Sequence, residues 1–299
     1  MHTMPPESDG RTADAAIAWA TAELSNAGVE GPARDARILV SAATGMDRVQ
    51  LLARPDVILS GPQIERVHDF VRRRRRREPV SRILGHRAFY GREFAISPST
   101  LDPRPDSETL IDAALELLAE DGANRDARLR IVDIGTGSGC LLVTLLAELP
   151  HAAGLGTDID PEALLLAKGN ASAHGVTERA EWSVSRSLEG LDGPFDLLIA
   201  NPPYIPTGDI ASLEPEVRDH DPRSALDGGC DGLDVYREIA AGLLRVVPEG
   251  WAIFEVGAGQ ADLVKTLLTD VASAPATPLV RVFRDLNGVD RCVAWKARH

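Results

Sequence analysis

From Leu129 onward, short apolar runs of strand length alternate with longer runs of helical periodicity, and this alternation limits the fold more than any other feature. Repeated strand–helix units of this kind build a doubly wound, mostly parallel sheet with helices on both faces. The expected fold class is therefore α/β. The predicted strands are 129–134, 153–157, about 182–184, 197–200, 251–256, 279–284 and 291–296, and the predicted helices cover 141–146, 162–173, 231–247 and 259–272.

The first 82 residues predict a small helical bundle instead. An apolar stripe from Ala13 to Leu24 follows Thr12, and a second helix runs from Pro32 to Thr44. Asp47 can cap a short third helix, and Ser60-Gly-Pro-Gln63 has the capping-box pattern of a fourth. Six consecutive arginines, Arg72–Arg77, end this fourth helix. They are typical either of a patch for an acidic partner or RNA, or of a solvated helix terminus.

The segment 83–105 differs from both neighbours in composition. Residues 85–96 alternate and are rich in aromatic side chains, which predicts a β-hairpin that links two domains. Asp106 can then cap a helix with Ile111, Leu115 and Leu118 on its apolar face. We expect domains at 1–82, 83–105 and 106–299. Arg104, between two prolines, forms either a linker salt bridge or a contact with a ligand or substrate.

Composition excludes several classes of protein. Apolar residues make up 44% of the chain, as in globular proteins, and no run approaches the roughly 18 apolar residues that span a bilayer. The N-terminal stretch lacks the apolar core of a signal peptide. Cys140, Cys230 and Cys292 are odd in number and widely spaced, so we expect a cytoplasmic protein without disulfides. Histidine spacing predicts no metal site.

Charge divides the chain unevenly. Residues 1–82 hold 13 arginines and 11 acidic residues, about +2, whereas the remainder holds 19 basic and 34 acidic residues, about −15. So acidic a C-terminal part repels phosphates. We therefore expect no direct sequence-specific contact with nucleic acid, no membrane attachment, and a monomer.

A glycine-rich loop follows the first predicted strand. Gly135-Thr136-Gly137-Ser138-Gly139 opens a helix, so the backbone can approach a ligand closely there. Asp158 ends the second strand, 23 residues after Gly135, where a carboxylate can accept both hydroxyls of a ribose. Asp133 beside the loop disfavours a pyrophosphate and favours a ligand with an ammonium group, such as S-adenosylmethionine.

The buried strand 197–200 ends in Asn201-Pro202-Pro203-Tyr204. Two prolines make this turn rigid and remove two backbone donors. The Asn201 side chain and the Pro202 carbonyl can then each accept one N–H of a planar –NH2 group, which orients its nitrogen for attack on a sulfonium methyl. The pattern predicts direct in-line methyl transfer with no covalent enzyme intermediate and no metal. By itself, it does not distinguish an amide from an adenine amino group.

Together these residues resemble the amino methyltransferases with a Rossmann-like class I fold. The whole chain is similar to the HemK/PrmC-type release factor glutamine methyltransferases. The similarity is carried also by blocks at 77–85, 103–108, 221–229, 231–236 and 254–257. It implies N5-methylation of the glutamine in the Gly-Gly-Gln motif of peptide chain release factors, with S-adenosylhomocysteine as the other product. The first domain would then dock the protein substrate.

Carried over by position, Gly135–Gly139 and Asp158 would bind the cofactor, and Asn201–Tyr204 would bind the glutamine amide, with Asn201, Pro202 and Tyr204 acting in catalysis. Asn201 would also border the cofactor. One departure concerns adenine: the family usually has an Asp-Trp pair after the third strand, and this chain has Val184-Ser-Arg-Ser187. Recognition of adenine on that side is expected to differ.

Three alternatives remain open at this level. An adenine-N6 methyltransferase of DNA or RNA would use the same tetrapeptide on a flipped base, but the acidic C-terminal part opposes it. A glutamine methyltransferase could instead act on a ribosomal protein. A methyltransferase fold without activity could serve as a binding module, which the presence of Asp158 and Asn201 argues against.

Overall fold

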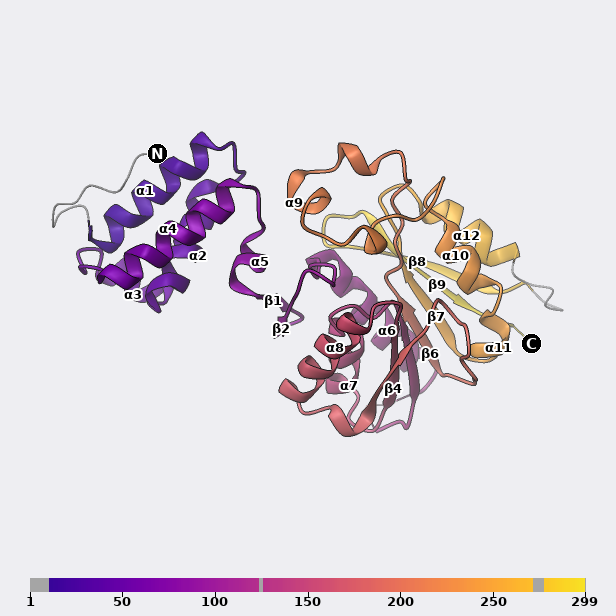
Figure 1. Ribbon diagram of the computed structural model, residues 1–299. Coiled ribbons are helices and arrows are strands. Elements are labelled where there is room, and N and C mark those ends of the chain that lie inside the picture. The colour runs from indigo at the N-terminus through magenta and orange to yellow at the C-terminus, as the bar shows by residue number, and fades with distance from the viewer. Residues whose placement is uncertain (1–10, 124–125, 271–276, 299) are drawn as a thin grey trace. The chain divides into compact units, whose positions relative to one another are not determined.

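The structure is a computed structural model that describes residues 11–123, 126–270 and 277–298. The chain divides into two compact units, residues 1–85 and 86–299. Each unit is described by itself, with its elements labelled as in Figure 1.

The first unit is helical. Its elements are α1 (Ala13–Asn26), α2 (Pro32–Thr44), α3 (Arg48–Ala53), α4 (Gly61–Arg75) and α5 (Val80–Leu84). The Thr12 hydroxyl accepts a hydrogen bond from the Ala15 backbone N–H over 3.2 Å and so caps α1. Asp47 and Gln50 exchange two hydrogen bonds at the start of α3, 2.7 and 2.9 Å long. Capping boxes begin α3 and α4. The four predicted helices are confirmed, and α5 was not predicted.

The arginine run at the end of α4 is largely used inside this unit. Arg74 is 6% exposed in its side chain and donates from Nε to Asp35 Oδ2 over 2.8 Å, with Asp35 2% exposed. This buried pair joins α4 to α2. Arg72, Arg75 and Arg76 are exposed, so the solvated helix terminus describes part of the run but not Arg74. Three further arginines form ion pairs with acidic residues of the same unit: Arg72 with Asp69, Arg73 with Glu78, and Arg75 with Glu23.

The second unit is built on a sheet with strand order β5-β4-β3-β6-β7-β9-β8 among the described residues. The first five strands in this order are parallel and the last two pair antiparallel. This arrangement confirms the doubly wound α/β class. The strands are β3 (Arg130–Ile134), β4 (Ala153–Asp158), β5 (Ala180–Val184), β6 (Leu197–Ala200), β7 (Trp251–Glu255), β8 (Leu279–Arg284) and β9 (Asp290–Lys296).

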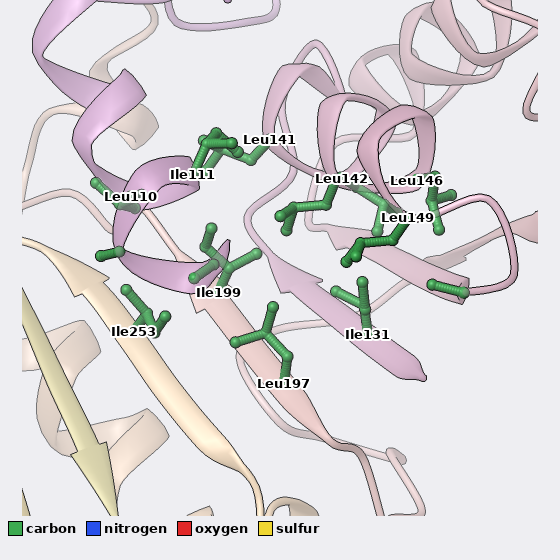
Figure 2. Packing of buried hydrophobic residues seen from close by; sticks show 14 of the residues in the cluster. Leu110, Ile111, Ile131, Leu141, Leu142, Leu146, Leu149, Leu197, Ile199 and Ile253 are labelled. Atoms are coloured by element: carbon green, nitrogen blue, oxygen red, sulfur yellow. The ribbon is translucent and has the colours of Figure 1, made fainter. Parts of the chain in front are cut away.

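Alternation along the central strands divides the core into two layers. Ile131, Leu197 and Ile253 belong to one apolar cluster, and their neighbours Val132 and Leu198 belong to the other. Figure 2 shows the first cluster, in which Leu110, Ile111 and several leucines of the next helix lie over the strands. Helices α6 (Glu108–Glu120) and α7 (Cys140–Glu148) supply that layer, with α8 (Pro161–Ala173) beside them. Helices α10 (Asp234–Ala240), α11 (Leu243–Val246) and α12 (Ala261–Asp270) supply the second.

The predicted hairpin is present as β1 (His86–Phe89) and β2 (Arg92–Ala95), which pair antiparallel. Phe89 and Phe94 are buried in the first apolar cluster. The hairpin is therefore part of the second unit's core. A short helix, α9 (Pro215–Arg218), lies in the segment after β6.

Two local predictions were wrong. The single helix expected over 231–247 is two helices, α10 and α11, because Gly242 interrupts it. A glycine weakens a helix, and a Cβ at this position would lie 2.8 Å from Leu188 Cδ1. Asp106 is not a helix cap either: it lies in the 3₁₀ helix η2 (Pro105–Ser107), and its carboxylate pairs with Arg291 over 3.0 Å. Positions 271–272 of the expected helix 259–272 lie outside the described residues.

Candidate active site

The predicted site residues follow two neighbouring strands. β3 and β6 are parallel, with Ile134 paired to Ala200, and the loops Gly135–Gly139 and Asn201–Tyr204 begin directly after these residues. The chain continues from β3 to its neighbour β4 on one side and from β6 to β7 on the other. Ligands of open α/β sheets bind at such a switch point, outside the carboxyl ends of the strands.

A cavity of about 310 Å³ lies at this edge of the sheet. This volume is within the range of small-molecule sites. Its lining includes most of the predicted site residues, namely Gly135, Thr136, Gly137, Ser138, Asp158, Asn201, Pro202 and Pro203. Gly139 and Tyr204 are not part of the lining. The structure thus brings the glycine loop, the acidic residue of β4 and most of the tetrapeptide to one hollow.

The three glycines of the loop are required for two reasons. Gly135 and Gly137 have φ of 69° and 54°, and a Cβ on either would meet no atom within 4 Å. Their backbone therefore turns in the left-handed region beside open space, which a ligand can occupy. Gly139 has φ of 78°, and a Cβ there would lie 3.0 Å from Ala167 Cβ. The third glycine therefore allows the start of α7 to pack closely on α8.

Asp133 holds the loop from beneath. It is 1% exposed, and the Thr136 hydroxyl donates to its Oδ2 over 2.6 Å. Its Oδ1 is buried with no hydrogen-bond partner among the described residues. Burial raises the pKa of Asp133 to about 7, although the hydrogen bond from Thr136 lowers it. Asp133 is not part of the cavity lining, so it supports the loop that a ligand would contact.

Asp158 is oriented by backbone hydrogen bonds. Its Oδ2 accepts from Gly137 N over 2.9 Å, and its Oδ1 accepts from Asp160 N over 3.0 Å. Asp160 in turn caps α8 by accepting from Glu162 N over 2.9 Å. Burial raises the pKa of Asp158, and the backbone hydrogen bonds lower it. The carboxylate is thus fixed at the cavity edge, where its remaining lone pairs can accept hydroxyl groups.

The end of β7 and the residues after it support the tetrapeptide Asn201–Tyr204. Gln260 Nε2 donates to the Tyr204 backbone oxygen over 2.9 Å, and Gly257 N donates to Gln260 Oε1 over 3.1 Å. Asn201 Nδ2 lies 3.4 Å from the Ser107 hydroxyl oxygen. Burial raises the pKa of the Tyr204 phenol to about 12, so this side chain stays neutral at physiological pH.

Sequence reasoning assigned no role to Ser107, Glu255 or Gln260. The first two lie in blocks that the resemblance singled out, at 103–108 and 254–257, and this was the available signal. Arg104 forms a salt bridge: its Nη2 lies 2.7 Å from Asp221 Oδ2. Of the two interpretations that the sequence left open for Arg104, the salt bridge is confirmed.

The cavity lining fits the predicted S-adenosylmethionine. Backbone of the glycine loop, the Asp158 carboxylate and the Asn201 amide supply polar groups, and Ile159, 53% exposed, supplies an apolar surface. Ser185, Arg186 and Ser187, which stand in place of the family's Asp-Trp pair, also line the cavity. Arg186 pairs with Glu238 over 2.7 Å. None of the described residues forms a cluster suited to a metal ion.

Comparison with known proteins shows the general class of protein to which this chain belongs. The model of the PrmC N-terminal domain matches residues 15–85, and the model of the methyltransferase small domain matches residues 106–212. The N-terminal domain of human METTL16 in complex with SAH has a similar fold: its TM-score is 0.51 at 17% identity, over 94% of this chain and 95% of that one. Fold and domain models together define an α/β methyltransferase.

Relatives of higher identity define the family. A release factor glutamine methyltransferase of Rhodospirillum rubrum is 45% identical over 94% of this chain and 83% of its own length. One of Bradyrhizobium diazoefficiens is 44% identical over 95% of each chain. This chain belongs to the family of release factor glutamine methyltransferases. Within the described ranges, none of its helices has both the length and the apolar character of a membrane span.

Proposed function

We propose that this protein transfers a methyl group from S-adenosylmethionine to N5 of the glutamine in the Gly-Gly-Gln motif of peptide chain release factors. The single observation that carries the proposal is the position of Asn201 and Pro202. They border the same cavity as the glycine loop and Asp158, at the end of the neighbouring parallel strand. A planar amide nitrogen bound there would lie next to a methyl donor bound by the loop.

Asp158 and Gly135–Gly139 would hold the cofactor, which supplies an electrophilic methyl group on a positively charged sulfur. The Asp158 carboxylate would accept the ribose hydroxyls, and the loop would leave room for the ligand at Gly135 and Gly137. Asn201, also in the cavity lining, would border the cofactor on the side of the substrate.

Asn201 Oδ1 and the Pro202 carbonyl would each accept one N–H of the glutamine amide. These two acceptors orient the amide so that its nitrogen lone pair is directed at the methyl carbon. A new C–N bond forms as the C–S bond breaks, and the nitrogen then loses one proton to solvent. Orientation of this kind can contribute roughly 7–11 kcal/mol to lowering a barrier. Pro203 and Tyr204 would complete the substrate contact.

The first unit would dock the release factor. A groove in it is lined by apolar side chains that include Ile17, Ile38 and Leu52, the last 70% exposed, and by three arginines, Arg34, Arg37 and Arg48. Deletion of the helical unit should leave cofactor binding in place and lower the apparent affinity for release factor. Unchanged methylation after the deletion would contradict this role.

Adenine in DNA or RNA is the second candidate substrate, because the tetrapeptide can also bind an exocyclic amino group. The net charge of about −15 on residues 83–299 opposes it, and we propose that the protein makes no direct sequence-specific contact with nucleic acid. We further propose that it acts as a monomer in the cytoplasm. The odd number and wide spacing of Cys140, Cys230 and Cys292 in the sequence support a reducing compartment.

The test is incubation of the protein with isotopically labelled S-adenosylmethionine and a release factor, followed by mass spectrometry of the modified peptide. The expected product carries one methyl group on the glutamine of the Gly-Gly-Gln motif. A release factor with alanine in place of that glutamine is the matched control and should remain unlabelled. Parallel reactions with ribosomal protein and with DNA test the alternatives, and label in either but not in release factor would overturn the proposal.

A further inference from the structure

Glu255 is a buried carboxylic acid next to the proposed substrate site. It ends β7, and β7 pairs in parallel with β6, with Phe254 opposite Ala200. The next positions along the two strands are Glu255 and Asn201, so they are neighbours across the strand ends. Glu255 is 2% exposed, and its Oε2 has no hydrogen-bond partner within the described part of the chain.

The side-chain amide of Asn201 can adopt two orientations, and nothing in the amide itself selects between them. Its side chain carries a donor, Nδ2, and an acceptor, Oδ1, of nearly the same shape, and only the acceptor can bind a substrate N–H. Ser107 Oγ lies 3.4 Å from Nδ2, which is long for a hydrogen bond. A hydroxyl can also donate as well as accept. Ser107 alone therefore does not determine which end of the amide faces the substrate.

A carboxylate can make this distinction because its oxygens only accept. The charge state of Glu255 depends on its neighbours. Burial and the Asp106 carboxylate raise its pKa, which lies at about 7. The Ser107 hydroxyl, the Arg291 guanidinium and the Asn201 amide lower it. Burial has the largest effect, so the carboxylate form that the positioning role needs is populated at and above about pH 7. An Asn201 amide turned the other way would put Oδ1 against the carboxylate oxygens, which is repulsive.

The backbone next to each of these two positions is fixed. The Tyr236 hydroxyl donates to the Glu255 backbone oxygen over 2.6 Å, and Gln260 holds the Tyr204 carbonyl over 2.9 Å. The backbone from which the Glu255 side chain extends is therefore fixed, while its Oε2 remains available to a neighbouring donor.

We propose that Glu255 is a positioning residue: its carboxylate holds Asn201 Nδ2 and so keeps Asn201 Oδ1 turned toward the amide nitrogen of the substrate. The inference rests on the proposed function, since it names what prepares the Asn201 acceptor for glutamine. Glu255 itself does not touch the reacting atoms.

The test is an exchange of the amide and the carboxylate between the two positions. E255Q lets position 255 donate as well as accept, so both orientations of Asn201 become accessible, and kcat should fall by roughly 10-fold or more. N201D places two carboxyl groups side by side and should also lower kcat. In the double variant N201D/E255Q an amide N–H faces a carboxylate again, and an oxygen at position 201 remains free for the substrate. Its kcat should exceed that of N201D by about 10-fold or more.

Two further measurements separate positioning from a general structural role. Calorimetry should give a Kd for S-adenosylmethionine within about 3-fold of the unaltered protein for both single variants, since the carboxylate acts on the substrate side. The Asn201 side-chain amide protons, identified in ¹⁵N spectra by their absence in N201D, should exchange with solvent several-fold faster in E255Q. E181Q is the matched control because Glu181 is exposed on β5, and it should leave kcat unchanged.

A double variant no more active than N201D, or unchanged amide exchange in E255Q, would overturn the positioning role and leave the proposed function intact. If the unaltered protein did not methylate glutamine at all, both would fail. The two failures are therefore distinguishable in one set of reactions.

Discussion

The Gly137 backbone N–H donates to Asp158 Oδ2 over 2.9 Å, so the glycine loop after β3 is bonded to the acidic end of β4. The residue predicted to bind ribose is thus also a support of the loop that would bind the rest of the cofactor. Each oxygen of the Asp158 carboxylate accepts one backbone hydrogen bond, and these two bonds fix the direction of the remaining lone pairs.

D158A is therefore expected to weaken binding of S-adenosylmethionine. Loss of even one of the two hydrogen bonds from the ribose to this charged group costs about 1.5–3 kcal/mol, so Kd should rise at least roughly 10–150-fold. Isothermal titration calorimetry measures it directly. E162A is the control, because Glu162 is an exposed acidic residue on the next helix, and it should bind as the unaltered protein does. An unchanged Kd for D158A would exclude the proposed ribose contact.

N201A is expected to separate binding from chemistry. The alanine variant keeps the loop and Asp158, so its Kd for S-adenosylmethionine should stay within about 3-fold. Removing one preorganised hydrogen-bonding group at a reacting centre typically lowers kcat by about 10²–10³. Single-turnover methylation of release factor gives the rate. Turnover at the unaltered rate would show that another group orients the amide.

Local patterns were sufficient for much of this architecture. Apolar runs of the right length predicted the strands, and the predicted caps at Thr12, Asp47 and Ser60 begin helices as expected. The glycine loop and the tetrapeptide could be paired from sequence because both follow parallel strands. Predictions failed where a contact distant in the chain decides the structure. Gly242 ends a helix against Leu188, and Asp106 pairs with Arg291.

The supports of the tetrapeptide could not be predicted for the same reason. Ser107 is 94 residues from Asn201, and Gln260 is 56 residues from Tyr204. No periodicity connects such positions, since they become neighbours only after the sheet has formed. The arginine run shows the opposite case: the pattern is plain in the sequence, but the sequence does not show that its member Arg74 is buried against Asp35.

That buried pair leads to a prediction for stability. R74A would remove the buried partner of Asp35 Oδ2, and among the described residues only the exposed Arg34 would still pair with the Asp35 carboxylate, at Oδ1 over 3.2 Å. Removing one member of a buried ion pair typically costs about 3–5 kcal/mol. R72A is the matched control, because the Arg72 and Asp69 side chains are 55% and 42% exposed, and it should cost at most about 1 kcal/mol. Urea denaturation of the full chain, followed by circular dichroism, compares them. Equal effects would show that the Arg74–Asp35 pair is not a support of the helical unit.

Asp133 makes stability depend on pH. Its folded pKa of about 7 lies above its ordinary value of 3.8, so the folded protein retains a proton that the unfolded chain releases. The stabilisation is complete below about pH 4 and is lost as pH rises toward 7 and above. Between pH 5 and pH 8, the unfolding free energy of D133N should therefore fall less than that of the unaltered protein. Glu255 contributes with the same sign, so some dependence remains.

The measurement is urea denaturation at several pH values without cofactor. D192N is the control, because Asp192 is exposed, and it should keep the slope of the unaltered protein. A D133N slope equal to that of the unaltered protein would contradict a raised pKa at Asp133.

Two glycines 30 positions apart give a matched pair with opposite expected signs. Gly139 has φ of 78° at the start of α7, and a Cβ there would lie 3.0 Å from Ala167 Cβ and 3.3 Å from Trp182. G139A therefore combines backbone strain with a close contact and should lower the unfolding free energy by about 1–3 kcal/mol. Gly169 lies exposed inside α8, where a Cβ would meet no atom within 4 Å. G169A should raise the unfolding free energy by about 0.5–1 kcal/mol, because alanine loses less backbone freedom in a helix. Denaturation of both variants under one set of conditions decides between these signs, and a stable G139A would mean that the close packing of α7 on α8 does not require glycine.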